Sequence, residues 1–262
     1  MLNMSLDEVA MWTHGSLHGA AAQVRGAGAD TRALQPGMLF VALAGERVDG
    51  HDYLAQAMAA GAAGALVTRR MDAALAQVQV GDTLRALGDL ASAARARSTA
   101  EVIGITGSSG KTTVKNLCAA IFAGIGSTHA TQGNQNNEIG LPLSLLNMRE
   151  DTRYAVLEMG AGKPGDIAYL AAIARPRVAL VNNVAPAHLE RLGSVEGVAE
   201  TKGAIYAALP ADGVAVINAD DAFAGYFTGQ AGARRVVRFG STSASATRPN
   251  CSTLRVPACA AK

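Results

Sequence analysis

From Glu101 onward, short apolar runs alternate with amphipathic stretches, and this alternation constrains the fold more than any other feature of the sequence. The apolar runs have the length of buried strands, and the stretches between them have helical spacing. This order predicts repeated strand–helix units and a mostly parallel sheet that is buried on both faces. The predicted strands are EVIGIT (101–106), YAVLEM (154–159), RVALVNNV (177–184) and GVAVINADD (213–221).

The first 82 residues predict a smaller α/β unit. Runs such as MLFVAL (38–43) and GALVT (64–68) alternate with Ala-rich stretches. A helical period begins after QVQV (77–80), so we place a domain boundary there and predict domains at 1–82 and 83–240. Residues 241–262 are rich in Ser, Thr, Ala and Pro without a sustained period, and we expect a disordered tail.

Composition argues against several classes of protein. The formal net charge is +2 with interspersed signs, which does not make the basic face of a nucleic-acid binder. Asp7 and Glu8 lie where a signal peptide needs a basic start, and no apolar run approaches the roughly 18 residues of a membrane span. The three cysteines form neither a disulfide framework nor a metal-ligand spacing. We therefore expect a cytoplasmic protein that neither binds nucleic acid nor inserts into membranes.

The stretch TGSSGKTT (106–113) predicts a phosphate-binding loop between a strand and a helix. The strict P-loop expression fails, because Ile105 takes the place of its first glycine. Glycines nevertheless let backbone N–H groups curl around an anion, and the helix N-terminus adds partial positive charge. The alternative is a glycine-rich turn with one solvated lysine. The predicted nucleotide contacts are Gly107, Ser108, Ser109, Gly110, Lys111, Thr112 and Thr113, with Lys111 on the outer phosphates and Thr112 on Mg²⁺.

The helix that follows this loop is expected to bury one apolar face. The residues assigned to that face are Val114, Leu117, Cys118, Ile121 and Phe122. Cys118 is interpreted there as a packing residue and not as a nucleophile.

Four longer motifs, in this order, resemble the Mur ligase family. They are TGSSGKTT, TQGNQNNEIGLPLSLL (131–146), LEMGAGKPGDI (157–167) and NVAPAHLERLGSVEGVAETKGAIY (183–206). The stretch DTRALQPGMLFVALAGERVDGHDYL (30–54) is similar to the nucleotide-sugar-binding domain of that family, and the resemblance runs to about Phe239. Within the family, GNQNNEIGLPL and PAHLE favour the branch that adds a dipeptide.

This resemblance implies an ATP- and Mg²⁺-dependent ligase that joins D-alanyl-D-alanine to UDP-N-acetylmuramoyl-tripeptide (UDP-MurNAc-tripeptide) in peptidoglycan synthesis. The tripeptide carboxylate would attack the γ-phosphate of ATP, and the dipeptide amine would displace phosphate from the acyl phosphate. We also expect a monomer. The alternatives are another Mur ligase, a folylpolyglutamate synthase or a noncatalytic nucleotide-binding remnant. A generic P-loop switch protein lacks support, because no base-specificity motif follows the loop.

The resemblance gives catalytic and metal roles to three residues besides Lys111 and Thr112. Glu158 would hold Mg²⁺, and a helix-capping acid is the alternative. His188 would bind a second Mg²⁺ near the γ-phosphate, unless it is a packing residue; nearby, Ala185 replaces a common glycine. Lys202 would become an oxygen ligand after its amine takes up CO₂ to form a carbamate, whereas a solvated surface lysine is the alternative.

The remaining predicted contacts lie on loops. Amides can bind phosphates and hydroxyls without adding charge, although they can also satisfy their own turns. The predicted loop between nucleotide and substrate carries Thr131, Asn134, Asn136 and Asn137. The predicted uridine diphosphate contacts are Asp30, Thr31, Arg32, Arg47, Asp49 and His51, with surface ion pairing as the alternative. Asn183, Asn218 and Asp220 are expected near the nucleotide.

Mur ligases have a third, C-terminal Rossmann-like domain that closes over ATP and contacts the incoming amine. No part of this sequence resembles that domain. We therefore expect the 262-residue chain to bind nucleotide weakly and to turn over poorly or not at all.

Overall fold

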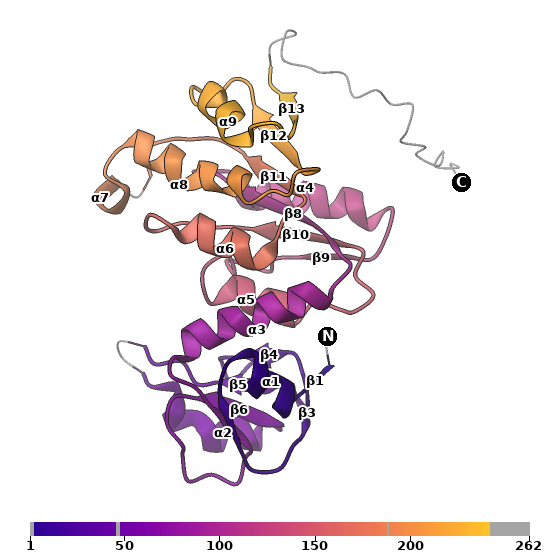
Figure 1. Ribbon diagram of the computed structural model, residues 1–262, viewed down its shortest axis with the longest axis vertical. Coiled ribbons are helices and arrows are strands. Elements are labelled where there is room, and N and C mark those ends of the chain that lie inside the picture. Colours follow the sequence, from indigo (N-terminus) through magenta and orange to yellow (C-terminus); the bar gives the residue numbers. More distant parts are fainter. Residues whose placement is uncertain (1–2, 46–47, 188, 242–262) are drawn as a thin grey trace.

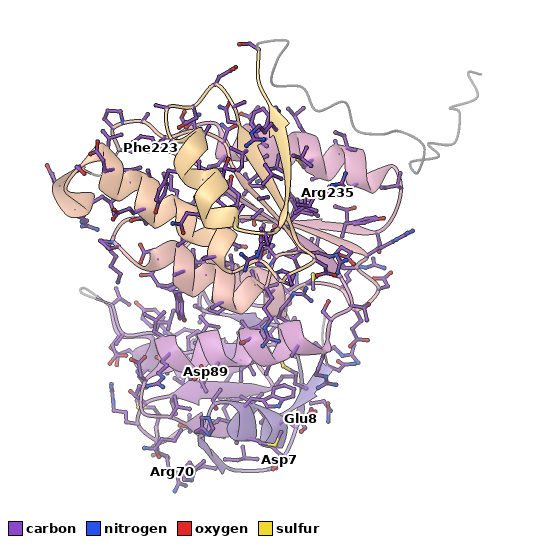
Figure 2. The ribbon with its side chains drawn as sticks, turned by 45° about the horizontal axis from the view of Figure 1, so that its top comes forward. Asp7, Glu8, Arg70, Asp89, Phe223 and Arg235 are labelled. Atoms are coloured by element: carbon purple, nitrogen blue, oxygen red, sulfur yellow. The ribbon has the colours of Figure 1, made fainter. Side chains whose placement is uncertain are left out.

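The computed structural model describes residues 3–45, 48–187 and 189–241. Two α/β units lie end to end, with helix α3 (Thr83–Arg97) between them (Figure 1). Asp89 of α3 lies between the end that carries Asp7 and Glu8 and the end that carries Phe223 and Arg235 (Figure 2). The α/β class with mostly parallel sheets, expected from the alternation of strands and helices, is confirmed.

The N-terminal unit is built on a five-stranded sheet with the order β2-β7-β6-β5-β4. Within it only the β2–β7 pair is antiparallel. A separate antiparallel pair joins β1 to β3. The strands are β1 (Asn3–Ser5), β2 (Ser16–His18), β3 (Gln23–Arg25), β4 (Ala27–Gly28), β5 (Leu39–Val41), β6 (Gly64–Val67) and β7 (Gln77–Gln79). The helices are α1 (Leu6–Trp12), the 3₁₀ turn η1 (Gly50–Tyr53) and α2 (Leu54–Ala59).

The second unit is a six-stranded, wholly parallel sheet with the order β13-β12-β11-β8-β10-β9. Its strands are β8 (Glu101–Thr106), β9 (Thr128–Ala130), β10 (Tyr154–Glu158), β11 (Val178–Val181), β12 (Val214–Asn218) and β13 (Arg235–Phe239). Its helices are α4 (Lys111–Ala123), α5 (Gly140–Leu146), α6 (Asp166–Ala174), α7 (Leu189–Leu192), α8 (Val195–Ala207) and α9 (Ala224–Ala231). The chain adds strands on one side of β8 and then on the other, so the carboxyl end of β8 is the expected ligand position.

One apolar core connects the two units through α3. It contains Leu66 of β6, Leu87 of α3 and Leu141 of α5. Asp82 caps α3, because its carboxylate accepts hydrogen bonds from the N–H groups of Leu84 and Arg85 at 2.8 and 3.0 Å. The helix therefore starts where the sequence predicts it, and the division into domains at 82/83 stays a prediction.

Helix α4 buries a narrower face than the sequence predicts. Val114, Cys118 and Phe122 pack on β8 and β10. Leu117 and Ile121 are 60% and 68% exposed, so the prediction that they face the core is wrong. The three packed residues are four positions apart and form one row along the sheet, which leaves positions 117 and 121 beside that row. Cys118 is half-buried, and burial raises the pKa of its thiol, as expected for a packing residue.

Candidate active site

The loop between β8 and α4 has the glycine-dependent backbone of a phosphate cradle. Gly107 and Gly110 have φ angles of +154° and +73°. Gly110 is the N-cap of α4, and a Cβ atom there would lie 2.7 Å from the Asn182 amide nitrogen. A left-handed backbone and a crowded Cβ position both favour glycine, so the sequence dictates this turn.

Replacing Gly110 by alanine is expected to destabilise the fold by about 1–2 kcal/mol, because an L-residue with positive φ is strained. The matched control is Gly229→Ala in the interior of α9, where a Cβ atom would meet nothing within 4 Å. That change should stabilise by about 0.5–1 kcal/mol. Urea unfolding of both variants measures the two effects, and equal behaviour would contradict the strained-turn assignment.

A second loop, residues 182–185, holds the cradle in shape. Asn183 accepts hydrogen bonds from the N–H groups of Ser108 and Ser109, through its backbone oxygen and its amide oxygen, each at 2.9 Å. Asn182 donates to the Ser109 backbone oxygen at 2.8 Å and accepts at its own from the Asn218 amide at 3.0 Å. Asn183 and Asn218, predicted near the nucleotide, thus contact this loop system.

Ala185 meets the cradle only through its backbone. The Ser108 hydroxyl donates to the Ala185 oxygen at 3.0 Å and accepts from its N–H at 2.9 Å. Since neither bond involves a side chain at position 185, alanine serves there as well as glycine.

The remaining N–H groups of the cradle are available to an anion. Among the described residues, the backbone N–H groups of Gly110, Lys111, Thr112 and Thr113 have no hydrogen-bond acceptor. Free N–H groups at a helix start, together with the helix dipole, make a favourable environment for phosphate oxygens. The Lys111 ammonium group donates to the Gly107 oxygen at 2.9 Å and so lies across the same loop.

The cradle opens into a cleft of about 420 Å³. Four basic side chains line it, against two acidic ones; they are Lys111, Lys163, Arg191 and Lys202, and Glu138 and Asp166. A cleft with an excess of positive charge concentrates anionic ligands.

Glu158 ends β10 beside the cradle and is 2% exposed. One carboxylate oxygen accepts from the Thr112 hydroxyl at 2.9 Å, and the other from the Asn136 amide at 2.7 Å. Within the described ranges, Glu158 forms no ion pair. Both bonds to the carboxylate come from side chains and none from a helix N–H group, so the described residues do not support the helix-capping alternative. The partners are neutral, which leaves the charge of the buried carboxylate for a cation to balance.

These oxygens fit Mg²⁺. The ion prefers hard oxygen ligands and is usually held by one or two protein groups together with phosphates and water. The Thr112 hydroxyl and the Glu158 carboxylate supply two such oxygens next to the free N–H groups. In the parts of the chain that the structure describes, no three His, Cys, Asp or Glu side chains gather as a metal site. Mg²⁺ at nucleotide sites is commonly held by one or two protein groups together with phosphate oxygens and water. His188 lies outside the described residues.

Lys202 is not a surface lysine. It lies on α8, is 3% exposed and lines the cleft. Burial, and then the charge of Lys111, lower its pKa from 10.5 to about 8. The solvated-lysine alternative is therefore wrong, and a larger fraction of this amine is neutral near pH 7 than in an ordinary lysine.

Lys115 is a second buried lysine, which the sequence reasoning missed. It is 4% exposed, and its ammonium group donates to the Thr131 backbone oxygen at 2.7 Å. Position 115 is four residues after 111 and three after 112 on α4, so a lysine at 115 lies on the side of the helix that carries the site. This spacing is the sequence feature that could have identified Lys115 as a buried residue near the site.

Two of the four predicted residues in the loop 131–137, Thr131 and Asn136, bond directly to Glu158. Thr131 is buried, and its hydroxyl accepts from the Glu158 N–H at 3.0 Å. Asn136 contacts Glu158 as above. Asn137 accepts from the Gly140 N–H at 2.8 Å, so it satisfies the turn before α5, as the structural alternative expected. Asn134 is exposed.

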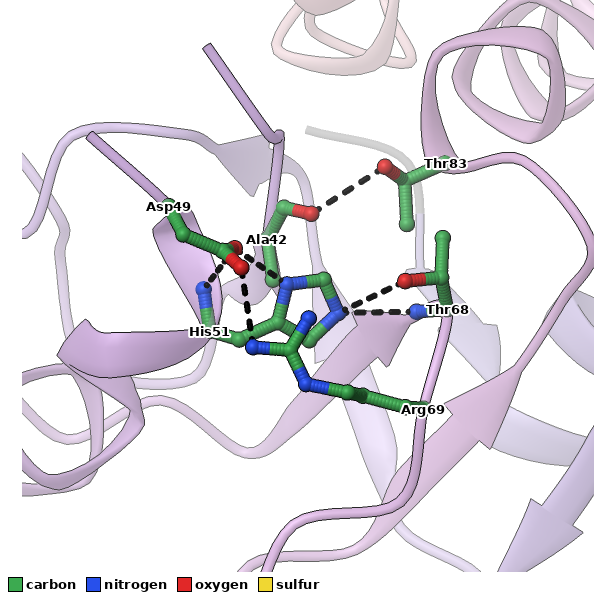
Figure 3. A network of polar contacts seen from close by, with 6 residues as sticks. All are labelled: Ala42, Asp49, His51, Thr68, Arg69 and Thr83. Carbon is green, nitrogen blue, oxygen red and sulfur yellow. Dashed lines mark hydrogen bonds and ion pairs between the residues drawn. The ribbon is translucent and has the colours of Figure 1, made fainter. Parts of the chain in front are cut away.

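In the N-terminal unit, His51 has a structural role (Figure 3). Its ring is buried; Nδ1 contacts the Asp49 carboxylate at 2.5 Å, and Nε2 accepts from the Thr68 N–H at 2.9 Å. Both ring nitrogens of His51 thus have partners in this unit, and its predicted contact with uridine diphosphate stays a prediction. Asp49 also pairs with Arg69 at 2.8 Å, and the bonds from His51 and then Arg69 lower the pKa of Asp49.

Arg32 and Asp30 form an exposed ion pair at 2.7 Å, in line with the surface-pairing alternative. The hydrogen bonds from Arg32 lower the pKa of Asp30 to about 2. Thr31 lies between them, and Arg47 is outside the described residues. Neither Arg32 nor Asp30 lines the cleft beside the cradle.

Two domain models, both of Mur ligases, match the chain. The Mur ligase middle domain matches residues 105–253, and the Mur ligase family catalytic domain matches residues 23–95. The first match runs past the predicted boundary at residue 240. Both agree with the motifs described above.

Individual relatives agree with these matches. UDP-N-acetylmuramoyl-tripeptide–D-alanyl-D-alanine ligase of Escherichia coli K12 is 45% identical over 245 residues, which are 94% of this chain and 54% of that enzyme. A crystal structure of MurF from Acinetobacter baumannii has a TM-score of 0.85 at 35% identity, covering 91% of this chain and 54% of its own. MurF ligase from Thermotoga maritima in complex with ADP has a TM-score of 0.73 at 35% identity, covering 83% and 50%.

The chain thus spans about half the length of the relatives it matches. Within that half, the phosphate cradle and the acidic residue beside it occur in the segment that matches the middle domain. The family match over more than half of the sequence and the 35% identical structures lead to one assignment. The chain belongs to the Mur ligase family.

Proposed function

We propose that this chain carries the ATP- and nucleotide-sugar-binding parts of a ligase that joins D-alanyl-D-alanine to UDP-MurNAc-tripeptide. The relatives named for that reaction, 45% identical in Escherichia coli, support the choice of substrates. The observation that carries the proposal is the free N–H cradle beside the Thr112–Glu158 pair. The reaction belongs to peptidoglycan precursor synthesis, on which cell shape and cell division depend, and we place it in the cytoplasm, in a monomer.

The site has to bring two anions together. The tripeptide carboxylate must approach the γ-phosphate of ATP, and Coulomb repulsion opposes that approach. Lys111 and the cradle N–H groups would bind the phosphate oxygens and stabilise the charge that develops on them. Mg²⁺, held by Thr112 and Glu158 with His188 as a further candidate ligand, would supply additional charge neutralisation. Asn136 would keep the Glu158 carboxylate oriented.

We further propose that Lys202 is carbamylated. Carbamate formation needs a neutral amine, and a pKa of about 8 leaves roughly a tenth of the amine neutral at pH 7. An unperturbed lysine has less than about a thousandth of its amine neutral at that pH. The product is an anion close to Lys111, which replaces a repulsive pair of cations by an attractive pair.

We propose that the uridine diphosphate is held by the N-terminal residues, which are Thr31, Arg32, Arg47, Asp49 and His51. Arg69 joins them as a candidate, because it binds the same Asp49 carboxylate. Asn134, Asn136 and Asn137 remain candidates for the sugar-peptide end, as Asn136 and Asn137 line the cleft.

The test is a binding and ligation series on the purified 262-residue chain. Calorimetry with Mg-ATP and then with UDP-MurNAc-tripeptide should show one site for each. A ligation assay with both substrates and D-alanyl-D-alanine then measures turnover, which we expect to be poor. Binding of Mg-ATP without any binding of the nucleotide sugar would favour the noncatalytic alternative. Preference for a UDP-MurNAc-dipeptide would instead favour another Mur ligase.

A further inference from the structure

Thr106, the last residue of β8, has a buried hydroxyl without a partner. Its side chain is 0% exposed, and its Oγ1 atom forms no hydrogen bond among the described residues. The backbone oxygen of Thr106 is satisfied by the Asn182 N–H at 2.8 Å, so only the hydroxyl is unpaired. Buried polar groups in folded proteins are nearly always hydrogen-bonded, and an exception calls for a ligand, a water or a modification.

The Thr106 side chain lies on the face of the sheet that α8 covers. Side chains alternate along a strand, so Thr106 and Gly104 share one face of the sheet. A Cβ atom on Gly104 would lie 3.1 Å from Cδ1 of Ile205, which places the Ile205 side chain over Gly104. Thr106 therefore lies on the face that α8 covers, two residues nearer the carboxyl edge.

Along the strand direction, Lys202 is the residue of α8 that lies closest to the position of Thr106. Helix α8 connects β11 to β12, and both are parallel to β8, so α8 runs antiparallel to these strands. Two strand residues span about 6.6 Å and one helical turn about 5.4 Å, so Thr106 matches a residue one turn before Ile205. Lys202 lines the cleft together with Gly107, the residue after Thr106.

A hydrogen bond fixes the same register. Val181 of β11 is the neighbour of Thr106 in the sheet, and its N–H donates to the Tyr206 hydroxyl at 3.0 Å. The same hydroxyl donates to the Val216 backbone oxygen of β12 at 2.8 Å, so Tyr206 holds α8 over β11 and β12, with Lys202 one turn from Tyr206 on the side of the carboxyl edge.

We propose that the Thr106 hydroxyl is a positioning group for a carbamate on Lys202, to one oxygen of which it donates a hydrogen bond. This inference rests on the proposed carbamylation. In that step the neutral amine attacks CO₂, an N–C bond forms, one C=O π bond opens onto oxygen, and a proton leaves the nitrogen to solvent. The carbamate brings two acceptor oxygens into a region where the structure provides an unused donor.

The test is ¹³C NMR of the full chain in ¹³C-bicarbonate, which reports the carbamate carbonyl directly and does not depend on catalysis. The wild type should show a carbamate signal that saturates with CO₂, and Thr106→Ser, which keeps the hydroxyl, should retain it. Thr106→Val, nearly isosteric without the hydroxyl, should need about 10-fold more CO₂ for half-occupancy, or about 1.4 kcal/mol. Circular dichroism confirms that each variant is folded, and Thr106→Ala replaces the valine variant if that one is not.

Two lysine variants assign the signal. Lys202→Met should abolish it, whereas Lys115→Met, which removes the other buried lysine, should leave it. A wild-type signal that is unchanged in Thr106→Val would overturn the role of Thr106 alone, with a buried water as its partner instead. A wild type without any signal would remove the carbamate and this inference with it, while Mg-ATP binding would still test the nucleotide site.

Discussion

Replacing Lys111 by alanine is expected to weaken Mg-ATP binding by about 100-fold, or about 2.7 kcal/mol. A hydrogen bond to a charged group contributes about 1.5–3 kcal/mol, and Lys111 would bond the outer phosphates directly. Its ammonium group lies on the cradle, where it donates to the Gly107 oxygen at 2.9 Å. Isothermal titration of both proteins with Mg-ATP measures the difference.

The control for Lys111→Ala is Arg235→Ala. Arg235 is an exposed cation at the start of β13, so it lies at the amino edge of the parallel sheet, away from the cradle. Removing Arg235 lowers the net charge by the same amount as removing Lys111. It should leave the affinity for Mg-ATP within about a factor of two of the wild type. Equal losses in the two variants would mean that the overall charge attracts the nucleotide and that the cradle does not bind it specifically.

Replacing Lys202 by methionine should stabilise the fold by up to about 3 kcal/mol at pH 7, because burial lowers the pKa of this lysine and the folded chain bears the cost of its charged form. The folded-state pKa is about 8, against 10.5 for the free side chain. Between these values the unfolded chain binds a proton at Lys202 that the folded chain does not. Stability therefore rises with pH across this window, and the penalty is fully present below pH 8.

The advantage of Lys202→Met should accordingly shrink above pH 8 and vanish above about pH 10.5. Urea unfolding in CO₂-free buffer without nucleotide isolates this effect from carbamate formation. Lys163→Met, an exposed lysine on the same cleft, should change stability by less than about 0.5 kcal/mol at all pH values. A pH-independent difference for Lys202→Met would contradict a buried, depressed lysine. A gain in stability from losing a site residue would also fit the trade-off between activity and stability.

The features that the sequence predicts are those set by neighbours along the chain. The strand 101–106, the glycine turn and the start of α4 follow from local patterns, and all lie at the predicted residues. Glu158 was predicted at a strand end from the same pattern, and the parallel pairing of β8 with β10 brings it to Thr112.

Other features depend on residues far apart in the sequence. Lys115 donates to Thr131, 16 positions away, and Asn183 shapes a loop 74 positions earlier. The ring of His51 accepts a hydrogen bond from Thr68, which follows β6 and lies 17 positions later in the chain, and no local pattern signals this contact. The exposure of Leu117 and Ile121 likewise depends on how α4 is rotated on the sheet. Helical periodicity predicts the buried side of a helix only to within about one residue position around its axis. The unpaired hydroxyl of Thr106 becomes visible only when every neighbour is placed.

The most direct test of the nucleotide site is a calorimetric titration of the folded 262-residue chain with ATP, once with Mg²⁺ and once with a chelator. We predict a single site with a Kd between about 1 μM and 1 mM with Mg²⁺, or about −8 to −4 kcal/mol. Affinity should be weaker with the chelator, since Thr112 and Glu158 then act without the cation. A folded chain that shows neither heat nor a rise in melting temperature at millimolar Mg-ATP would contradict the assignment of residues 106–113 as the phosphate cradle.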